Sequence, residues 1–452
     1  MKVVSFELTT EQLIAHLHEA RARLLELVSD LDDQQMIGPQ LSIVNPLRWE
    51  IAHVAHFQEF WLLRHQRGYE PIKPAANLDP DKLYDSAKVH HDTRWDLPLP
   101  SKQMTIDYIQ RILDRVTEKA LKQSAPPDAD GYDDNYFLHL SLLHEDMHNE
   151  AITYTRQTLG YRVCSSAFRR RQLGTSGRAA LQPQPPKGGT TNVIGDVMIP
   201  GGVFKLGSDL DSGFVFDNEL LAHEVTVAPF AMSRTTTSNA EFLAFVEAGG
   251  YRCREFWNDE GWHWRESVAA EHPVYWRQID GEWQRRIFDC WVRLEPTFPV
   301  IHVNWFEADA YCRWAGRRLP TEAEWELAAS LGVAGNKRKF PWGDDSPMPE
   351  CANLDWLAGG LLPVDALPTG DSAFGVRQMI GNVWEWTATN FAAFNGFTPG
   401  PYKEYSAPWF GDHKVLRGGC WATRSRLIRN CYRNFYKPDR RDVWAGFRTC
   451  AR

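Results

Sequence analysis

The sequence changes character near residue 190, and this change sets the strongest limit on how the chain can fold. Before it, long stretches carry apolar residues at helical spacing, whereas after it short β-like runs are broken by glycine and proline. Between them, residues 169–192 are rich in Arg and then in Gly, Ser, Gln and Pro, which is typical of an interdomain linker. We therefore predict a helical domain over residues 1–168 and an α+β domain with much irregular structure over residues 193–452.

Four helices are expected in the first domain. The first, over residues 9–31, opens with a capping box, and Asn45-Pro46 starts the second, because proline suits a first helical position. The second helix is expected to run to about residue 67. A third helix follows Ser101 and ends near residue 123, and a fourth covers residues 133–160. Helices with one apolar stripe each predict a four-helix bundle.

The fourth predicted helix carries His144 and His148, whose side chains lie about 40° apart around a helix of 3.6 residues per turn. Both imidazoles can therefore bind one metal ion, and His53, on the apolar stripe of the second helix, is the best candidate for a third ligand. The alternative is that the pair are ordinary polar residues on a helix face. Leu143 and Met147 beside them predict burial, and buried imidazoles need partners, so a metal site is favoured.

Composition excludes several other functions. The net charge of -8 argues against nucleic acid or an anionic membrane as a partner, and three arginines at 169–171 are interpreted as a solvated face. No apolar run is long enough to span a bilayer, and the N-terminus lacks a signal peptide's apolar core, so we expect a cytoplasmic protein. The 8 cysteines form no CxxC pair, which predicts reduced thiols. Most of the 19 tryptophans follow residue 250, which predicts aromatic packing in the second domain.

A family resemblance rests on five blocks, in order, in the second half of the chain. The blocks are Arg318–Glu326, Phe340–Asp344, Gly381–Thr387, Leu416–Gly419 and Ala445–Arg448. They resemble the signatures of the formylglycine-generating-enzyme (sulfatase-modifying) fold, a C-type-lectin-like α+β fold, and the first half resembles a DinB-type four-helix bundle. This fusion is similar to the EgtB family, iron-dependent enzymes that join sulfur to C2 of the imidazole of hercynine, the betaine of histidine.

The resemblance implies a ligand set and a mechanism. The family's three iron ligands map onto His53, His144 and His148, and Fe(II) with open positions for O2 and substrate is the implied cofactor. Hercynine and the donor are expected to bind at the iron together with O2, while a tyrosine of the second domain assists proton or electron transfer. Tyr402 and Tyr405 match the family's YxxY element, with a pair of surface-loop tyrosines as the alternative.

Hercynine carries a trimethylammonium group and a carboxylate, so its pocket needs aromatic or neutral polar groups and hydrogen-bond donors. Asn434 matches an Asn-Trp-Asp-like element of the family and is expected to contact substrate. Phe435 and Tyr436 depart from that element, where the family has an aromatic residue and an acid. Met147 also departs, because a glutamine commonly precedes the second histidine of the pair.

The donor side differs from the family pattern as well. Forms that use γ-glutamylcysteine have two arginines three residues apart, able to fork onto its carboxylates. Here Arg94 remains, but His91 stands in the place of the other arginine. The loop more closely resembles the SenA-type selenoneine synthases of the same superfamily, which couple hercynine to a selenosugar. The resemblance therefore implies a selenosugar or thiosugar donor, with cysteine or γ-glutamylcysteine as the alternative, and leaves the oligomeric state open.

Two other classes of function remain open. A zinc-dependent DinB-like thiol transferase shares the three histidines but does not explain a complete second domain. A non-catalytic binding module would explain the second domain but has no need of three metal-directed histidines. The metal bound after anaerobic purification separates them, because iron favours the oxygen-dependent enzyme, zinc the transferase and no metal the binding module.

Overall fold

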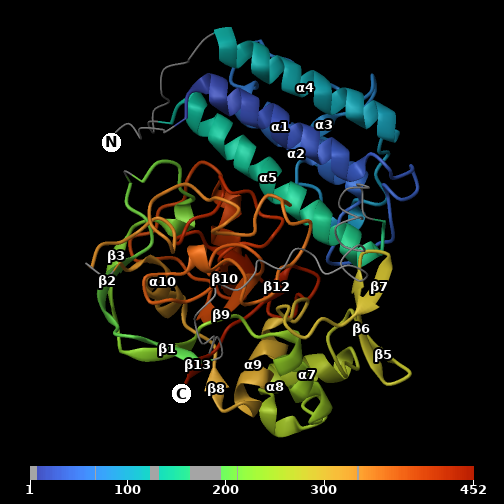
Figure 1. Cartoon of the computed structure of the whole chain (residues 1–452). Helices are drawn as coiled ribbons and strands as arrows, with labels where there is room; N and C mark the ends of the chain where they lie inside the picture. The colour runs from blue at the N-terminus through green and yellow to red at the C-terminus, as the bar shows by residue number, and fades with distance from the viewer. Residues whose placement is uncertain (1–7, 67, 123–131, 163–194, 211, 333–334) are drawn as a thin grey trace. The chain divides into compact units, whose positions relative to one another are not determined.

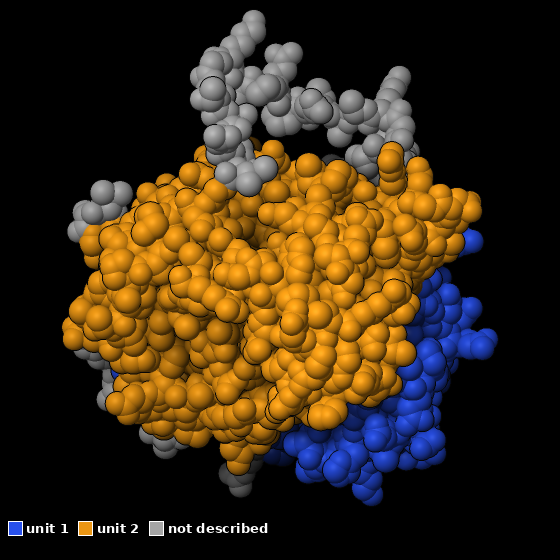
Figure 2. All heavy atoms as spheres, turned by 90° about the horizontal axis from the view of Figure 1, so that it is seen from below, with its two compact units in different colours: residues 1–164, 210–214 blue, residues 165–209, 215–452 orange. Residues whose placement is uncertain are grey.

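The computed structural model describes residues 8–66, 68–122, 132–162, 195–210, 212–332 and 335–452 (Figure 1). Two compact units make up the chain, residues 1–164 with 210–214 and residues 165–209 with 215–452 (Figure 2). The predicted linker at 169–192 lies outside the described residues. Helices dominate the first unit, and the second combines strands, helices and irregular segments, which confirms the α+β two-domain prediction.

The first unit is a four-helix bundle. Its long helices are α1 (Thr10–Val28), α2 (Leu47–Leu62), α4 (Lys102–Lys122) and α5 (Asp134–Leu159). The loop between α2 and α4 contains the short helix α3 (Pro80–Tyr84) and a 3₁₀ turn at His91–Thr93. Helix α1 packs against α4 and α5, and α2 packs against the same two helices. Figure 1 shows the four running side by side.

Local sequence signals set most helix ends. The predicted capping box of Thr9 and Gln12 opens α1, and Asp133 accepts a hydrogen bond from the Tyr136 amide at the start of α5. Gly160, at φ 65°, ends α5 in the left-handed conformation that glycine adopts without strain. The prediction for α2 was wrong at both ends. Pro46 is the N-cap rather than the first helical residue, and the helix stops at Leu62.

A buried ion pair ties three helices of the bundle together. The Nε of Arg21 on α1 donates to Glu145 Oε1 on α5 at 2.8 Å, and Nη2 donates to Gln58 Oε1 on α2 at 3.0 Å. All three side chains are buried, so this network satisfies polar groups that would otherwise destabilise the core. Because it joins α2 to α5, it also fixes the register of the two helices that carry the predicted metal ligands.

The second unit contains four sheets among its described residues. The first, in spatial order, is β1 (Asp196–Ile199), β4 (Phe230–Ser233), β13 (Cys450–Ala451) and β8 (Arg317–Arg318), and the second is β11 (Asn434–Tyr436), β10 (Lys414–Arg417), β9 (Trp384–Asn390) and β12 (Ala445–Gly446). The third pairs β2 (Gly202–Leu206) with β3 (His223–Val227), and the fourth is β5 (Trp276–Ile279), β6 (Glu282–Ile287) and β7 (Cys290–Arg293). The helices are α7 (Asn239–Glu247), α8 (Asp259–Ser267), α9 (Trp305–Trp314) and α10 (Glu322–Ser330).

One expected hairpin is absent from the described part of this unit. The sequence of residues 197–207, with two short apolar runs on either side of Gly201-Gly202, predicts a hairpin, but β1 pairs with β4 and β2 pairs with β3. Gly201, at φ 68°, makes the corner between them, and a Cβ there would lie 2.4 Å from the carbonyl oxygen of Val227. The backbone at Gly201 lies close to the backbone at Val227, and the strands before and after this corner belong to different sheets. A pattern of alternating apolar residues does not reveal such a corner.

The signature blocks supply buried ion pairs to the core of the second unit. Arg448 donates to both oxygens of Glu385 at 2.6 and 2.7 Å, and Trp325 Nε1 donates to Glu385 Oε2 at 2.8 Å. Arg417 pairs with Glu322 at 3.0 Å and also with Glu326. Four of the five blocks therefore meet in the interior, where each charge has an opposite partner.

Candidate metal centre

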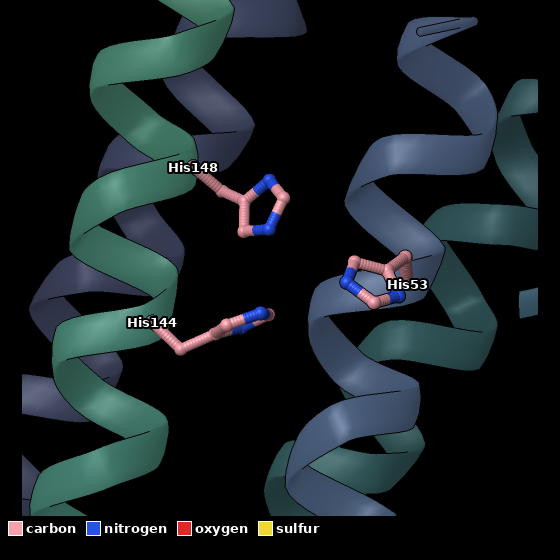
Figure 3. A group of neighbouring side chains, drawn as sticks. All are labelled: His53, His144 and His148. Carbon is pink, nitrogen blue, oxygen red and sulfur yellow. The ribbon is translucent and has the colours of Figure 1, made fainter. Parts of the chain in front are cut away.

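Three histidines from two helices of the bundle converge on one point. His53 lies on α2, and His144 and His148 lie one turn apart on α5 (Figure 3). One ring nitrogen from each lies within 4.8 Å of those of the other two. The ring centroid of His53 lies 5.3 Å from that of His144 and 5.2 Å from that of His148. Among the described residues this is the one group of potential ligand side chains with this geometry.

Hydrogen bonds at the outer nitrogens orient two of the rings. His53 Nδ1 lies 2.8 Å from the carbonyl oxygen of Tyr84, the last residue of α3. His148 Nδ1 lies 2.9 Å from Glu50 Oε1. Both partners are acceptors, so both Nδ1 atoms carry the proton and both Nε2 lone pairs are left for a metal. This arrangement is common behind metal-binding histidines.

Aromatic rings hold the histidines from the sides. The Trp49 indole stacks on His53 with centroids 4.8 Å apart and an interplanar angle of 6°. Phe57 stacks on His144 at 3.8 Å and 8°. Rings stacked in this way have little freedom to rotate, which favours a preformed site.

Burial keeps the imidazoles of His53 and His144 neutral. Burial first, and next the proximity of His148, lower the pKa of His53 well below its usual value. The same two causes lower the pKa of His144 well below its usual value, with His53 contributing as well. A neutral imidazole is the form that binds a metal, so at neutral pH these two ligands need lose no proton.

Two further histidines in the bundle are engaged elsewhere. His56 lies one turn from His53, but its Nε2 is 2.9 Å from Asp81 Oδ1. His139 on α5 has its Nδ1 3.2 Å from the carbonyl oxygen of Asn135, and its ring stacks on Phe214. Neither belongs to the convergent group.

The two residues predicted to bind the donor, Arg94 and His91, already have protein partners. The guanidinium carbon of Arg94 lies 3.8 Å above the Trp49 ring, and its Nη1 donates to Asn45 Oδ1 at 2.6 Å. Burial lowers the pKa of Arg94 to about 10. His91 Nε2 donates to the carbonyl oxygen of Val44 at 2.6 Å. Met147, next to His148, is partly exposed.

Four residues around the centre were not among the sequence-based candidates, namely Asn45, Trp49, Glu50 and Phe57. Trp49 and Phe57 are each four residues from His53 and Glu50 is three, spacings that place them on one face of a helix. That spacing was a usable signal. The spacing identifies side chains that support a metal ligand. These residues were missed because the sequence-based candidates at the metal were chosen as side chains that bind the metal directly.

Both predicted catalytic tyrosines of the second unit lie in one aromatic cluster with Phe435. The Tyr405 hydroxyl lies 3.1 Å from that of Tyr432, and its ring centroid lies 5.7 Å from that of Phe435 and 5.9 Å from that of Tyr402. Burial raises the pKa of Tyr405 well above its usual value, so the phenol stays protonated. The structure thus brings the YxxY element and β11 together.

The other predicted side chains of this region have varied surroundings. Asn434 Oδ1 accepts a hydrogen bond from the Phe435 amide at 2.8 Å, and the Arg440 guanidinium lies 5.1 Å from the Tyr436 ring. The sequence also offers Arg424, Arg426 and Arg429 as replacements for the missing arginine of the donor site. Arg424 pairs with Asp355 in the structure, and Arg429 pairs with Glu219.

Comparison with known proteins agrees with this architecture. Residues 16–151 match the DinB superfamily, and residues 182–452 match the sulfatase-modifying factor enzyme 1-like domain. The hercynine oxygenase of Mycolicibacterium thermoresistibile is 39% identical over 446 residues, which cover 97% of this chain and 94% of that protein. The hercynine oxygenase of Mycobacterium tuberculosis is 37% identical over 443 residues, with coverages of 97% and 98%. Among solved structures, PvdO from Pseudomonas aeruginosa matches 56% of this chain and 93% of its own at 24% identity, with a TM-score of 0.42.

The full-length matches define the protein as an oxygen-dependent oxidoreductase. It belongs to the EgtB-like family, in which a DinB-type bundle is fused to a sulfatase-modifying-factor-like domain. The resemblance inferred from the signature blocks is thereby confirmed. None of the described helices has the length and apolar character of a membrane-spanning segment.

Proposed function

We propose that the protein is a non-haem Fe(II) enzyme that uses O2 to join selenium, or sulfur, to C2 of the imidazole of hercynine. The observation that carries this proposal is the group of His53, His144 and His148, in a chain related over its full length to hercynine oxygenases. Three imidazoles leave coordination positions open, which O2 chemistry on Fe(II) requires. The same ligands also suit zinc, so a zinc thiol transferase is the alternative of another class.

The electron balance fits an oxygenase. Joining an imidazole C–H to a selenol Se–H or a thiol S–H removes two hydrogens, and oxidation of the selenium or sulfur to a selenoxide or sulfoxide removes two further electrons. Together these match the four-electron reduction of O2, with one oxygen atom in the selenoxide or sulfoxide and the other in water. The metal supplies O2 activation when it is bound. The protein supplies orientation through the anchored histidines and, in our proposal, proton transfer through the partly buried phenol of Tyr405.

Hercynine is the proposed acceptor, with Asn434 and the aromatic cluster of Tyr405 and Phe435 as its contacts. Aromatic faces attract a trimethylammonium group, which histidine lacks. We therefore expect hercynine to bind the iron-loaded protein more tightly than histidine does, by about tenfold or more if the cation–π contribution reaches ~1.4 kcal/mol. Isothermal titration calorimetry under anaerobic conditions measures both affinities. Equal affinities would mean that no pocket for the trimethylammonium group exists.

A selenosugar, or a related thiosugar, is the proposed donor. A donor with carboxylates needs a guanidinium fork, but Arg94 already donates to Asn45 and to the carbonyl oxygen of Val89, and His91 donates to Val44. Neutral hydroxyl groups need no such fork. The alternative is an ergothioneine-type sulfoxide synthase that uses cysteine or γ-glutamylcysteine.

A competition assay separates these donors. We expect iron-loaded protein, given hercynine and O2, to convert a 1-seleno-sugar in preference to equal amounts of cysteine and γ-glutamylcysteine, because only the sugar avoids burying an unpaired carboxylate. Mass spectrometry of the products reads the outcome. Efficient sulfoxide formation from a cysteine donor, without reaction of the selenosugar, would assign the protein to the ergothioneine branch. Zinc in the protein purified without oxygen, and no turnover after iron loading, would favour the transferase.

A further inference from the structure

A buried carboxylate stands directly behind one of the three histidines. Glu50 lies on α2, one turn before His53, and its side chain is 2% exposed. Its Oε1 accepts the hydrogen bond from Nδ1 of His148 at 2.9 Å, across from α2 to α5. Glu50 thus belongs to the helix of one ligand and bonds to a ligand on the other helix.

A second set of contacts extends from Glu50 to the outer loop of the bundle. Asn45 Nδ2 lies 3.5 Å from Glu50 Oε2, and Asn45 Oδ1 accepts from Arg94 Nη1 at 2.6 Å. The same guanidinium lies 3.8 Å above Trp49. Since the Trp49 ring stacks on His53, the assembly of Asn45, Trp49, Glu50 and Arg94 contacts two of the three histidines.

We propose that Glu50 is a positioning residue for the metal centre, and that Asn45 and Arg94 hold it and Trp49 in place. This inference rests on the proposed function only in requiring that the three histidines bind a divalent metal. A carboxylate that accepts from Nδ1 fixes the ring so that Nε2 faces the metal, and it makes the imidazole a stronger donor. Its negative charge also offsets the charge of a dication held by neutral imidazoles in a buried place.

Two substitutions of Glu50 separate its effect on the orientation of the His148 ring from the effect of its negative charge. Glu50→Gln keeps an oxygen that can accept from His148 but removes the charge, whereas Glu50→Ala removes both. We expect Glu50→Gln to weaken Co(II) binding by about tenfold and Glu50→Ala by about 100-fold, the range typical for outer partners of metal-binding histidines. Co(II) titration, followed by its visible absorption and by competition with a chelator, measures the affinity. In Glu50→Ala the absorption band should also shift, because the His148 ring is free to turn.

Glu59 offers a matched control on the same helix. It is as buried as Glu50, but it binds Arg64, the Tyr69 hydroxyl and the Ile72 amide, away from the histidines. Glu59→Gln should cost stability, seen in thermal unfolding of the metal-free protein, while leaving Co(II) affinity within about twofold of wild type. A purely structural Glu50 would give the same result as Glu59.

The possible failures are distinguishable. If wild-type protein and His148→Ala bind Co(II) equally weakly, the metal site itself is wrong and the proposed function fails with it. If wild type binds tightly and both Glu50 variants match the Glu59→Gln control in affinity and absorption, the metal site stands and the role given to Glu50 is overturned. Weakening in Glu50→Ala with full affinity in Glu50→Gln would overturn the charge argument and leave only orientation.

Discussion

Replacing His148 with Ala is expected to abolish both metal binding and turnover. The change removes one of three ligands and leaves the buried carboxylate of Glu50 without its bond to the Nδ1 atom. The affinity should therefore fall by more than about 100-fold, the upper range for loss of an outer partner alone. Metal analysis by mass spectrometry after anaerobic iron loading, together with O2 uptake in the presence of hercynine and a donor, measures the two effects.

A second histidine on α5 supplies the control. His139 is also buried, but its ring contacts Phe214 and a backbone carbonyl rather than the other histidines. His139→Ala should retain metal at wild-type level, although it loses some stability through the cavity that it creates. Full iron occupancy in His148→Ala would exclude this residue as a ligand, and the assignment of the site to α2 and α5 would then be wrong.

The part of this centre that the sequence could predict depends on helical periodicity. Residues four apart on one helix share a face whatever the rest of the chain does, so the sequence alone is enough to pair His144 with His148. The ends of α5 were equally accessible, because Asp133 and Gly160 are local capping signals. The third histidine required a further assumption, namely that a second apolar stripe faces the first.

Helical spacing identifies candidates for the supporting residues, but it could not predict which ligand each of them contacts, because that depends on tertiary contacts. Nothing in the local sequence pairs Glu50 with His148, which is 98 residues away. The contact of Arg94 with Trp49 likewise depends on how the loop after α3 returns to the bundle. From the sequence, Arg94 is expected to lie in a surface loop with its side chain exposed to solvent or to a ligand, because arginine side chains are mostly exposed. A contact with a tryptophan of the bundle is not expected.

In the second unit, the sequence identified a family but not what its signatures do. Arg417 and Arg448 stand in blocks that resemble motifs, and motifs are commonly taken for functional sites. The structure places both side chains in the interior, paired with glutamates from other blocks. Much of what makes the second half recognisable is therefore a set of paired charges in the interior of the second unit.

Replacing Arg448 with Leu is the second change with a large expected effect, on stability rather than on activity. It should lower the free energy of unfolding of the second unit by about 3–5 kcal/mol, because it leaves Glu385 buried without a counter-charge. Both side chains are 0% exposed, and the remaining bond from Trp325 Nε1 does not neutralise the carboxylate. Guanidinium-induced unfolding followed by tryptophan fluorescence measures the change.

The double variant and a surface control test the cause. If the uncompensated charge is responsible, Arg448→Leu combined with Glu385→Leu should be more stable than Arg448→Leu alone, since an apolar pair carries no buried charge. Arg313→Leu, which removes a partly exposed ion pair with Asp309 on α9, should cost under about 1 kcal/mol.

A double variant less stable than either single one would instead assign the loss to packing and to the three backbone carbonyls that Arg448 binds. Because those carbonyls lie on two segments far apart in the sequence, the arginine would then act chiefly as a cross-link of the backbone, and its charge would be incidental.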